Sequence, residues 1–218
     1  MNIQEYEQDR EPKYKRSTRS KRFTPRMIAF FHQCFTYSKS TGILRWRKDR
    51  PAAHFKTEAA YKRYLKVNAG TPAGTPQGDG GHLQVQFSQH PTKKGVRNFC
   101  AYVHRIAYAM IKGEDPGPML LDHKNGDTTD NRWSNLRLAT KAENAHNRKA
   151  SRHSTTGVLG VSVVPYKEQV RYLATLQKGG IRHARLFRTL QAATEQRHAW
   201  EREYHGKFAA SACRPTLQ

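Results

Sequence analysis

The chain has 218 residues, a length that suits one medium domain or two small modules, and we expect two small modules. Its 39 Lys and Arg against 17 Asp and Glu give a formal net charge of +22, a surplus that attracts polyanions. Nucleic acid is therefore the expected partner, with a merely soluble basic surface or an anionic membrane as alternatives. No apolar run approaches the roughly 18 residues of a membrane span. Acidic residues stand where a signal peptide has its apolar core, so a soluble, intracellular protein is expected.

The three cysteines, Cys34, Cys100 and Cys213, are far apart, and none belongs to a CxxC pair. This spacing excludes a disulfide framework and a four-cysteine zinc site, so no structural zinc is expected. A metal ion would have to be held by oxygen and imidazole ligands, which favours a hard ion such as Mg²⁺.

The N-terminal region changes from acidic to basic within residues 1–26, where KYKRSTRSKRFTPR has no apolar periodicity. A flexible basic arm is expected there, either clamping phosphates or serving only as a solvated tail. MIAFFHQCFTYS predicts a short amphipathic helix, and STGILRWR predicts a turn at Gly42 before a short strand. A long, exposed Gly/Pro-rich loop should then lead into a strand that carries Leu83, Val85 and Phe87 on one face.

The segment AYVHRIAYAMIKGEDPGP predicts a helix that ends at Gly113 before two prolines. One side of this helix carries Val103, Ile106, Ala107 and Met110. His104 and Arg105 lie inside it. A histidine in such a place is more often structural than catalytic, whereas Arg105 is a candidate for contact with a phosphate.

The stretch LDHKNGDTTDNRWSNLRLATKAENAHN predicts a strand, a loop, a second strand and a helix. MLLDHK forms the first strand, NGD a tight turn and NLRLAT the second strand. Thr140 and Glu143 form a capping box that starts a helix running through Asn147. The adjacent Asp122 and His123 would face opposite sides of an ideal strand, so a shared site requires the strand to end or distort there.

The residues DHKNGDTTDNRWSNLRLATKAEN resemble the HNH endonuclease motif, in the asparagine-ending form of phage homing endonucleases. Residues 119–148 carry the ββα core of a nuclease domain expected over residues 27–150. The preceding STGILRWR and VHRIAYA segments are similar to the N-terminal part of many phage HNH proteins. The resemblance implies one divalent ion, Mg²⁺ or alternatively Mn²⁺. It also implies double-stranded DNA as substrate, and the cytoplasm of a phage-infected bacterial host as the location.

The resemblance also implies roles for four residues. His123 would be the general base and Asp122 a metal ligand, while Asn135 would brace the loop as part of the catalytic set. Asn144 would replace the final histidine of the motif as second metal ligand. The chemistry agrees, because phosphodiester cleavage needs an activated water and charge neutralisation at the phosphate. An imidazole suits the first task and a divalent ion the second.

Other polar residues of this stretch have open roles. Asn147 and Arg148 follow Asn144 on the same helical face, and either is a candidate DNA contact. The alternative, that the asparagines serve only turns and caps, explains Asn125 and Asn131.

After a basic connection, TTGVLGVSVVP, VRYLATLQ and RHARLFR predict three short strands, and LQAATEQRHAWEREYHGKF predicts a helix. This helix carries Ala193, Trp200 and Tyr204 on one face. The block resembles the APETALA-type, or ethylene-responsive-factor, DNA-binding domain of plants, over residues 151–210, followed by a tail over residues 211–218. In that family the three-stranded sheet enters the major groove.

The resemblance implies that Tyr172, Ala174 and Leu176 face the helix of this module. The candidates for the DNA-facing side are Arg171, Thr175, Gln177, His183 and Arg185. Val164 and His183 occupy places where tryptophan or arginine is common, so base specificity is not carried over. The alternative is a sheet that binds only phosphates or another protein.

The expected fold class is α+β, with a ββα-metal nuclease module and a C-terminal three-stranded antiparallel sheet packed on one helix. The leading functional hypothesis is a metal-dependent HNH DNA endonuclease of the phage homing or nicking type. A non-catalytic, sequence-specific DNA-binding regulator is the alternative, and an RNA-binding, ribosome-associated protein is a third hypothesis.

Overall fold

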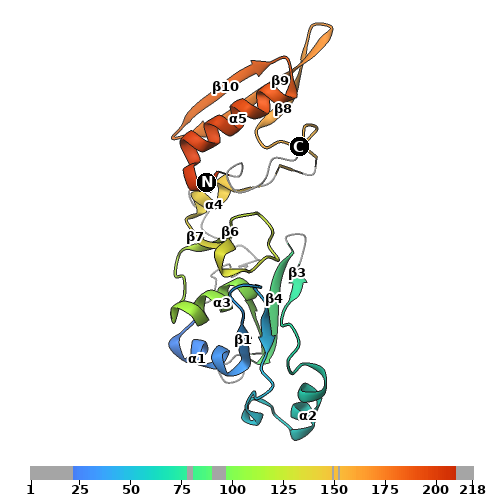
Figure 1. Ribbon diagram of the computed structural model, residues 1–218, viewed down its shortest axis with the longest axis vertical. Coiled ribbons are helices and arrows are strands. Elements are labelled where there is room, and N and C mark those ends of the chain that lie inside the picture. The colour runs from blue at the N-terminus through green and yellow to red at the C-terminus, as the bar shows by residue number, and fades with distance from the viewer. Residues whose placement is uncertain (1–21, 78–80, 90–96, 149, 152, 210–218) are drawn as a thin grey trace, which may run out of the picture.

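The computed structural model describes residues 22–77, 81–89, 97–148, 150–151 and 153–209. They form an α+β protein whose N-terminal and C-terminal parts lie end to end along the long axis, which confirms the predicted fold class (Figure 1). Of the expected basic arm, residues 1–21 lie outside the described part, as does the expected tail. Among the described residues, no helix combines the length and the hydropathy needed to cross a membrane.

The N-terminal part is built around one helix pair and a small antiparallel sheet. Its elements are, in chain order, α1 (Pro25–Cys34), β1 (Phe35–Tyr37), β2 (Leu44–Trp46), η2 (Ala52–His54), α2 (Glu58–Val67), β3 (Thr75–Gln77), β4 (His82–Gln89), β5 (Arg97–Tyr102) and α3 (Val103–Lys112). Helix α1 begins at Pro25 because the Thr24 hydroxyl caps it by accepting the Met27 N–H at 3.3 Å. It ends earlier than predicted, since the chain continues as β1, which pairs antiparallel with β2.

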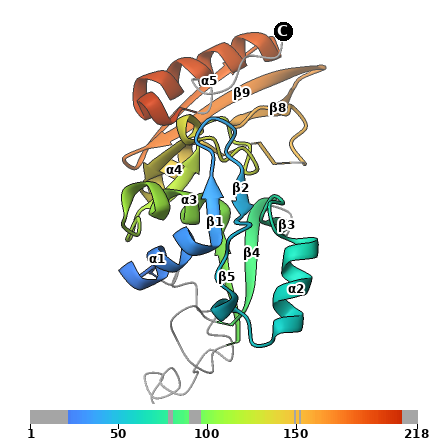
Figure 2. The same cartoon turned by 60° about the horizontal axis from the view of Figure 1, so that its bottom comes forward.

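The main core lies between α1, α3 and the β3–β4–β5 sheet (Figure 2). Val85 and Phe87 on β4 are buried in this core and Leu83 packs against the core, as the alternating pattern predicted. Helix α3 ends at Gly113, which adopts the left-handed conformation with φ of 73°. The core therefore holds α3 against the β3–β4–β5 sheet, close to the first residues of β4.

Several elements of this part were not predicted, among them α2, β3 and β5. Helix α2 is capped by Thr57, whose hydroxyl accepts the Ala60 N–H at 3.2 Å, and it buries Tyr64. The Gly/Pro-rich segment expected as a long exposed loop contains β3, which pairs with the first residues of β4. The expectation of an unbroken loop was therefore wrong.

The ββα unit forms as predicted. It consists of β6 (Leu120–His123), η3 (Trp133–Asn135), β7 (Leu136–Ala139) and α4 (Lys141–His146). Strands β6 and β7 pair antiparallel, with Asp122 opposite Arg137 and His123 opposite Leu136. The predicted capping box is present, because the Thr140 hydroxyl accepts the Glu143 N–H and the Glu143 carboxylate accepts the Thr140 N–H.

The C-terminal part is a meander of three antiparallel strands covered on one face by a helix, as predicted (Figure 1). Its elements are β8 (Val161–Tyr166), β9 (Gln169–Lys178), β10 (Ile181–Phe187), α5 (Leu190–His205) and η4 (Gly206–Phe208). Val161, Ala174 and Ala193 form the buried centre, with Tyr172 and Trp200 packed against it. Small residues at the centre let α5 lie close to the sheet.

Candidate active site

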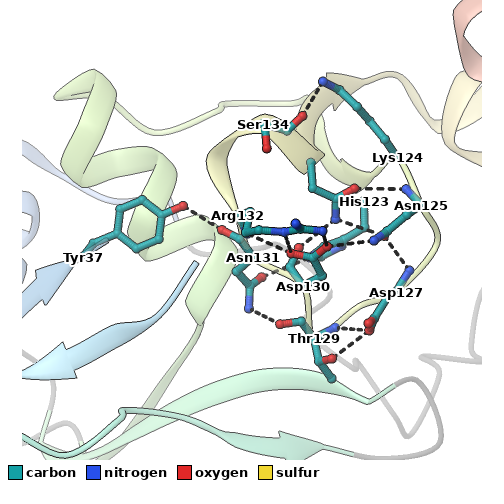
Figure 3. A network of polar contacts seen from close by, with 11 residues as sticks. Tyr37, His123, Lys124, Asn125, Asp127, Thr129, Asp130, Asn131, Arg132 and Ser134 are labelled. Carbon is teal, nitrogen blue, oxygen red and sulfur yellow. Dashed lines mark hydrogen bonds and ion pairs between the residues drawn. The ribbon is translucent and has the colours of Figure 1, made fainter. Parts of the chain in front are cut away.

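His123 is the last residue of β6, and its ring is buried and held by an asparagine. Its Nε2 lies 3.0 Å from Oδ1 of Asn131, whose Nδ2 donates to the Thr129 carbonyl at 3.2 Å (Figure 3). The second bond fixes the amide orientation, so Oδ1 must accept the Nε2–H of His123. In the neutral ring, Nδ1 then carries the lone pair that can accept a proton or bind a cation. Sequence reasoning gave Asn131 only a turn role, which this contact corrects.

Asn135 ties together the loop between β6 and β7. Its Oδ1 accepts the Asn125 N–H at 3.1 Å, and its Nδ2 donates to Asn125 Oδ1 at 3.0 Å and to the Asp130 carbonyl at 2.7 Å. Asp130 in turn accepts from Asn125 and forms an ion pair with Arg132 (Figure 3). These contacts place Asn135 in support of the loop, away from direct contact with His123.

A hairpin far away in the sequence supports the same loop from outside. The Tyr37 hydroxyl donates to the Asn131 carbonyl at 2.6 Å (Figure 3). Gly42, at the turn between β1 and β2, lies so close to the loop that a Cβ atom there would be 2.3 Å from the Arg132 nitrogen. The β1–β2 hairpin therefore fixes the backbone that carries Asn131.

Asp122 is buried and takes its partners from β7 and from the end of α4. Arg137 donates through Nε to Oδ2 at 2.7 Å, and Asn147 donates through Nδ2 to Oδ1 at 3.0 Å and to the His123 carbonyl at 2.8 Å. His123 contacts Asn131 instead. Strand β6 ends at His123, which is the condition that a site shared by Asp122 and His123 requires. The two side chains nevertheless have separate partners, because successive side chains of a strand point to opposite faces.

The two asparagines of the helix differ in their contacts. Asn144 is partly buried in α4 and its side chain forms no hydrogen bond among the described residues. Asn147, considered from the sequence as a DNA contact, is buried and bonded to Asp122 instead. The amide that touches the carboxylate is therefore the one after α4, one helical turn beyond the expected ligand.

A hard divalent ion fits the donors around Asp122. The carboxylate of Asp122 and the side-chain amide oxygens of Asn144 and Asn147 are oxygen ligands, the type that Mg²⁺ prefers. Oδ2 of Asp122 is engaged by the Arg137 guanidinium, whereas the only hydrogen bond to Oδ1 among those described comes from Asn147. Since each carboxylate oxygen has two lone pairs, Oδ1 retains one for a cation.

Two further histidines lie beside His123. The ring centroids of His82 and His104 lie 5.6 Å and 5.2 Å from that of His123. Burial lowers the pKa of His104 well below its ordinary value, and the neighbouring His123 and His82 lower it further. Burial and then His123 likewise lower the pKa of His82. The sequence favoured a structural role for His104 and gave no role to His82.

Comparisons with known proteins identify the family of this chain. A model of the HNH endonuclease family matches residues 101–146. Protein 3.8 of Escherichia phage T7 is 30% identical over 106 residues, which are 49% of this chain and 86% of that protein. The chain belongs to the HNH endonuclease family. The matched segment comprises α3 and the ββα unit, and it includes Asp122, His123, Asn131, Asn135 and Asn144.

Two further similarities extend the comparison. An uncharacterised HNH endonuclease of Acanthamoeba polyphaga mimivirus is 33% identical over 110 residues, 50% of this chain and 55% of that protein. A structure titled "DNA binding and cleavage by the HNH homing endonuclease I-HmuI" is similar over 74% of this chain and 76% of that chain. Its identity of 18% and TM-score of 0.33 are too low to support any argument. None of these matches confirms the APETALA resemblance of the C-terminal part.

Within the HNH segment, Arg105 does not lie where a phosphate contact was expected. Its guanidinium is buried, pairs with Asp115 at 2.8 Å and lies over the Phe23 ring at 5.4 Å. Because Asp115 neutralises it inside the fold, the position argues against contact with DNA. Arg148, just after α4, is exposed and remains a candidate.

In the C-terminal part, the prediction that His183 and Arg185 face away from the helix was wrong. They pair with Leu176 and Ala174, and directly paired residues share one face of a sheet. His183 stacks on Tyr204 with centroids 4.7 Å apart, and Nη1 of Arg185 lies 3.4 Å from Gln196 of α5. Alternation confirms that Tyr172, Ala174 and Leu176 face α5 and puts Arg171, Thr175 and Gln177 on the opposite face.

The two parts of the chain meet beside Asp122. Arg137 donates through Nη1 to the Lys207 carbonyl, and its guanidinium lies 4.3 Å from the centre of the Phe208 ring. His146 and His205 stack in parallel, with centroids 3.7 Å apart. Burial, followed by His146, lowers the pKa of His205 to about 4. The end of the C-terminal helix therefore touches the same arginine that binds the site carboxylate.

Proposed function

We propose that this chain is a metal-dependent DNA endonuclease that hydrolyses phosphodiester bonds, with His123 as the general base. The observation that carries the proposal is the Asn131 contact, which leaves the Nδ1 lone pair of His123 available at the end of β6. This residue lies inside the segment that matches the HNH family. The specific form that we propose is a phage-type homing or nicking enzyme.

In this proposal, His123 Nδ1 accepts the proton of the attacking water, and Asn131 keeps the ring in one orientation through Nε2. Asn135 holds the loop that carries Asn131. One divalent ion, Mg²⁺ or alternatively Mn²⁺, would be held by Asp122 and Asn144 and would neutralise charge on the phosphate and on the leaving 3′ oxygen. Asn147 positions the carboxylate of Asp122.

Double-stranded DNA is the proposed substrate, because a formal net charge of +22 favours binding to its phosphates. The outer face of the C-terminal sheet offers Arg171, Thr175 and Gln177 as candidate contacts to base edges. Arg148 is a candidate phosphate contact beside the ββα unit. In this division, the ββα unit cuts and the C-terminal sheet selects the site, as the APETALA resemblance implies.

One observation favours a second candidate, a non-catalytic, sequence-specific DNA-binding regulator. The Asp122 carboxylate already has a cationic partner in Arg137, at 2.6 Å from Nη2. A carboxylate neutralised in this way could serve only to hold the fold together. On that alternative, the chain binds DNA and cleaves none.

The two candidates differ in what the protein does to supercoiled plasmid. Purified full-length protein should convert it to open circles or linear DNA with Mg²⁺, lose this activity with excess chelator, and regain it when Mg²⁺ is restored. Open circles indicate nicking, and linear product indicates paired cuts. Gel-shift titration in the same buffers measures binding. DNA binding without conversion under all metal conditions would favour the regulator.

A further inference from the structure

Three imidazoles from three different elements meet beside the candidate active site. His82 begins β4, His104 lies in the first turn of α3, and His123 ends β6. One ring nitrogen from each lies within 4.8 Å of the other two. Only the tertiary fold brings these residues together, because they lie far apart in the sequence.

One buried nitrogen of the cluster lacks a hydrogen-bond partner. His104 is buried, and its Nδ1 has no hydrogen-bond partner among the described residues. Buried polar nitrogens normally have one. His82 is only half-buried, so it forms the side of the cluster from which an ion can enter.

The lone pair of His123 is directed by Asn131. Because Nε2–H is donated to Asn131, Nδ1 is the nitrogen that can bind a cation. Histidines that bind metals usually donate their other N–H in this way, which fixes the ring and raises its basicity. The contact that suits a general base therefore also suits a metal ligand.

We propose that His82, His104 and His123 bind a borderline divalent transition-metal ion, Zn²⁺ above all, and that the bound ion inhibits cleavage by occupying Nδ1 of His123. Imidazole suits zinc, whereas Mg²⁺ prefers oxygen ligands, so the ion would be distinct from the one at Asp122. Three histidines and one water form a common tetrahedral set around zinc. The binding half rests on the cluster alone, and the inhibition half rests also on the proposed endonuclease function.

Metal binding requires a small closure of the cluster. With zinc–nitrogen bonds of about 2.0–2.1 Å, ligand nitrogens approach to about 3.3 Å of one another. The nitrogens lie within 4.8 Å, so rotation of the half-buried His82 side chain is the expected adjustment. The matched test variant is therefore His82→Gln, which removes the outermost ligand and leaves the two buried rings in place.

The binding test uses the full-length protein, stripped of metal and titrated with Co²⁺ followed by visible absorption, and with Zn²⁺ followed by calorimetry. Wild type should bind one equivalent with the absorption of tetrahedral cobalt. His82→Gln should weaken the Kd at least about 10-fold. The exposed His32 provides the control, because His32→Gln should bind as wild type does. An absent cobalt band, or equal Zn²⁺ affinity in His82→Gln and wild type, would overturn the site.

The inhibition test adds Zn²⁺ to plasmid cleavage at saturating Mg²⁺. The cleavage rate of each variant with zinc is compared with its own rate without zinc. The Zn²⁺ concentration that halves the rate should be higher for His82→Gln than for wild type, by the same factor as the Kd for Zn²⁺. Zinc bound at the cluster without any loss of cleavage would contradict the capture of His123. If no cleavage occurs under any condition, the proposed function fails, while the binding titrations still decide whether the site exists.

Discussion

The position of His123 depends on partners that no local sequence pattern identifies. Asn131 was interpreted from the sequence as a turn residue, and the local sequence around a turn asparagine does not show whether its amide reaches a histidine ring such as that of His123. His82 lies on β4, which β5 and α3 separate from β6 in the sequence, so its approach to His123 depends on tertiary packing. The Asp122–His123 pair was found from the motif, yet the separate partners of the two side chains became evident only in the fold.

The contacts of Asn144 and Asn147 lead to a prediction about the metal ligands. Asn144→Ala should raise the Mg²⁺ concentration needed for half-maximal cleavage, because it removes the oxygen assigned to the ion. Asn147→Ala leaves a hydrogen bond to the buried Asp122 unmade, so it should lower both stability, by about 1–3 kcal/mol, and cleavage.

Mg²⁺ titrations of the cleavage rate and urea unfolding separate these two effects. An unchanged Mg²⁺ requirement in Asn144→Ala, together with a raised one in Asn147→Ala, would assign the second ligand to Asn147. His32→Ala, an exposed substitution away from the site, is the control for both measurements.

Periodicity and capping predicted most helices and strands, but they did not predict which side chains of each strand point toward the helix. The strands β8, β9 and β10 and helix α5 lie where alternation and apolar spacing placed them. The face that each residue of RHARLFR occupies could not be read from its sequence, because both sets of alternating residues contain basic and apolar side chains. His183 and Arg185 were therefore assigned to the wrong face. Helix α2 was missed although Thr57 and Glu58 form a typical N-terminal pair.

The hairpin between β1 and β2 yields a prediction with an internal control. Gly42 and Gly113 both have φ of 73°, but only Gly42 has backbone atoms of another segment where a Cβ would lie. Gly42→Ala should therefore lower the free energy of unfolding more than Gly113→Ala, by about 1 kcal/mol or more. Urea denaturation of the three proteins measures this. An equal decrease in the free energy of unfolding for the two variants would mean that the hairpin does not contact the loop beside Asn131 closely.

The side of the sheet on which each arginine of β9 and β10 lies predicts which arginine contacts DNA. Arg171→Ala removes a charge from the outer face and should weaken DNA binding and reduce the salt slope by about 1. Arg185→Ala changes a side chain on the α5 side and should leave both nearly unchanged. Fluorescence titrations at several salt concentrations compare the two variants. The reverse order of effects would show that the helix side of the sheet carries the DNA contacts.

The whole molecule joins the ββα unit, which is the candidate cutting unit, to a candidate reading unit through Arg137. This arginine binds Asp122 and also contacts Lys207 and Phe208 at the end of the chain's last described helix. The sequence predicted two modules and a basic connection, but not that the second module contacts the β6–β7 hairpin. That contact depends on the direction of α5 across its sheet, which composition and periodicity do not determine.

Truncation after Ala150 tests this division. The shortened protein should bind DNA with less selectivity, because base-edge contacts are expected from the C-terminal sheet while many basic residues remain. Footprinting should show a shorter protected site, and the affinity should fall less steeply with salt. The truncation also removes the contacts of Arg137 with Lys207 and Phe208, while its ion pair with Asp122 stays within the shortened protein. An unchanged footprint and cleavage position would assign reading to the N-terminal part.

The role of His123 as general base is tested by comparing cleavage with binding in His123→Ala. A general base contributes roughly 100-fold to 10,000-fold to the rate and little to binding of the ground state. We therefore predict a rate loss of that size, measured on supercoiled plasmid at saturating Mg²⁺, with a DNA Kd within about 2-fold of wild type. His32→Ala should match wild type in both. Undiminished cleavage, or a loss of affinity as large as the loss of rate, would contradict the assignment.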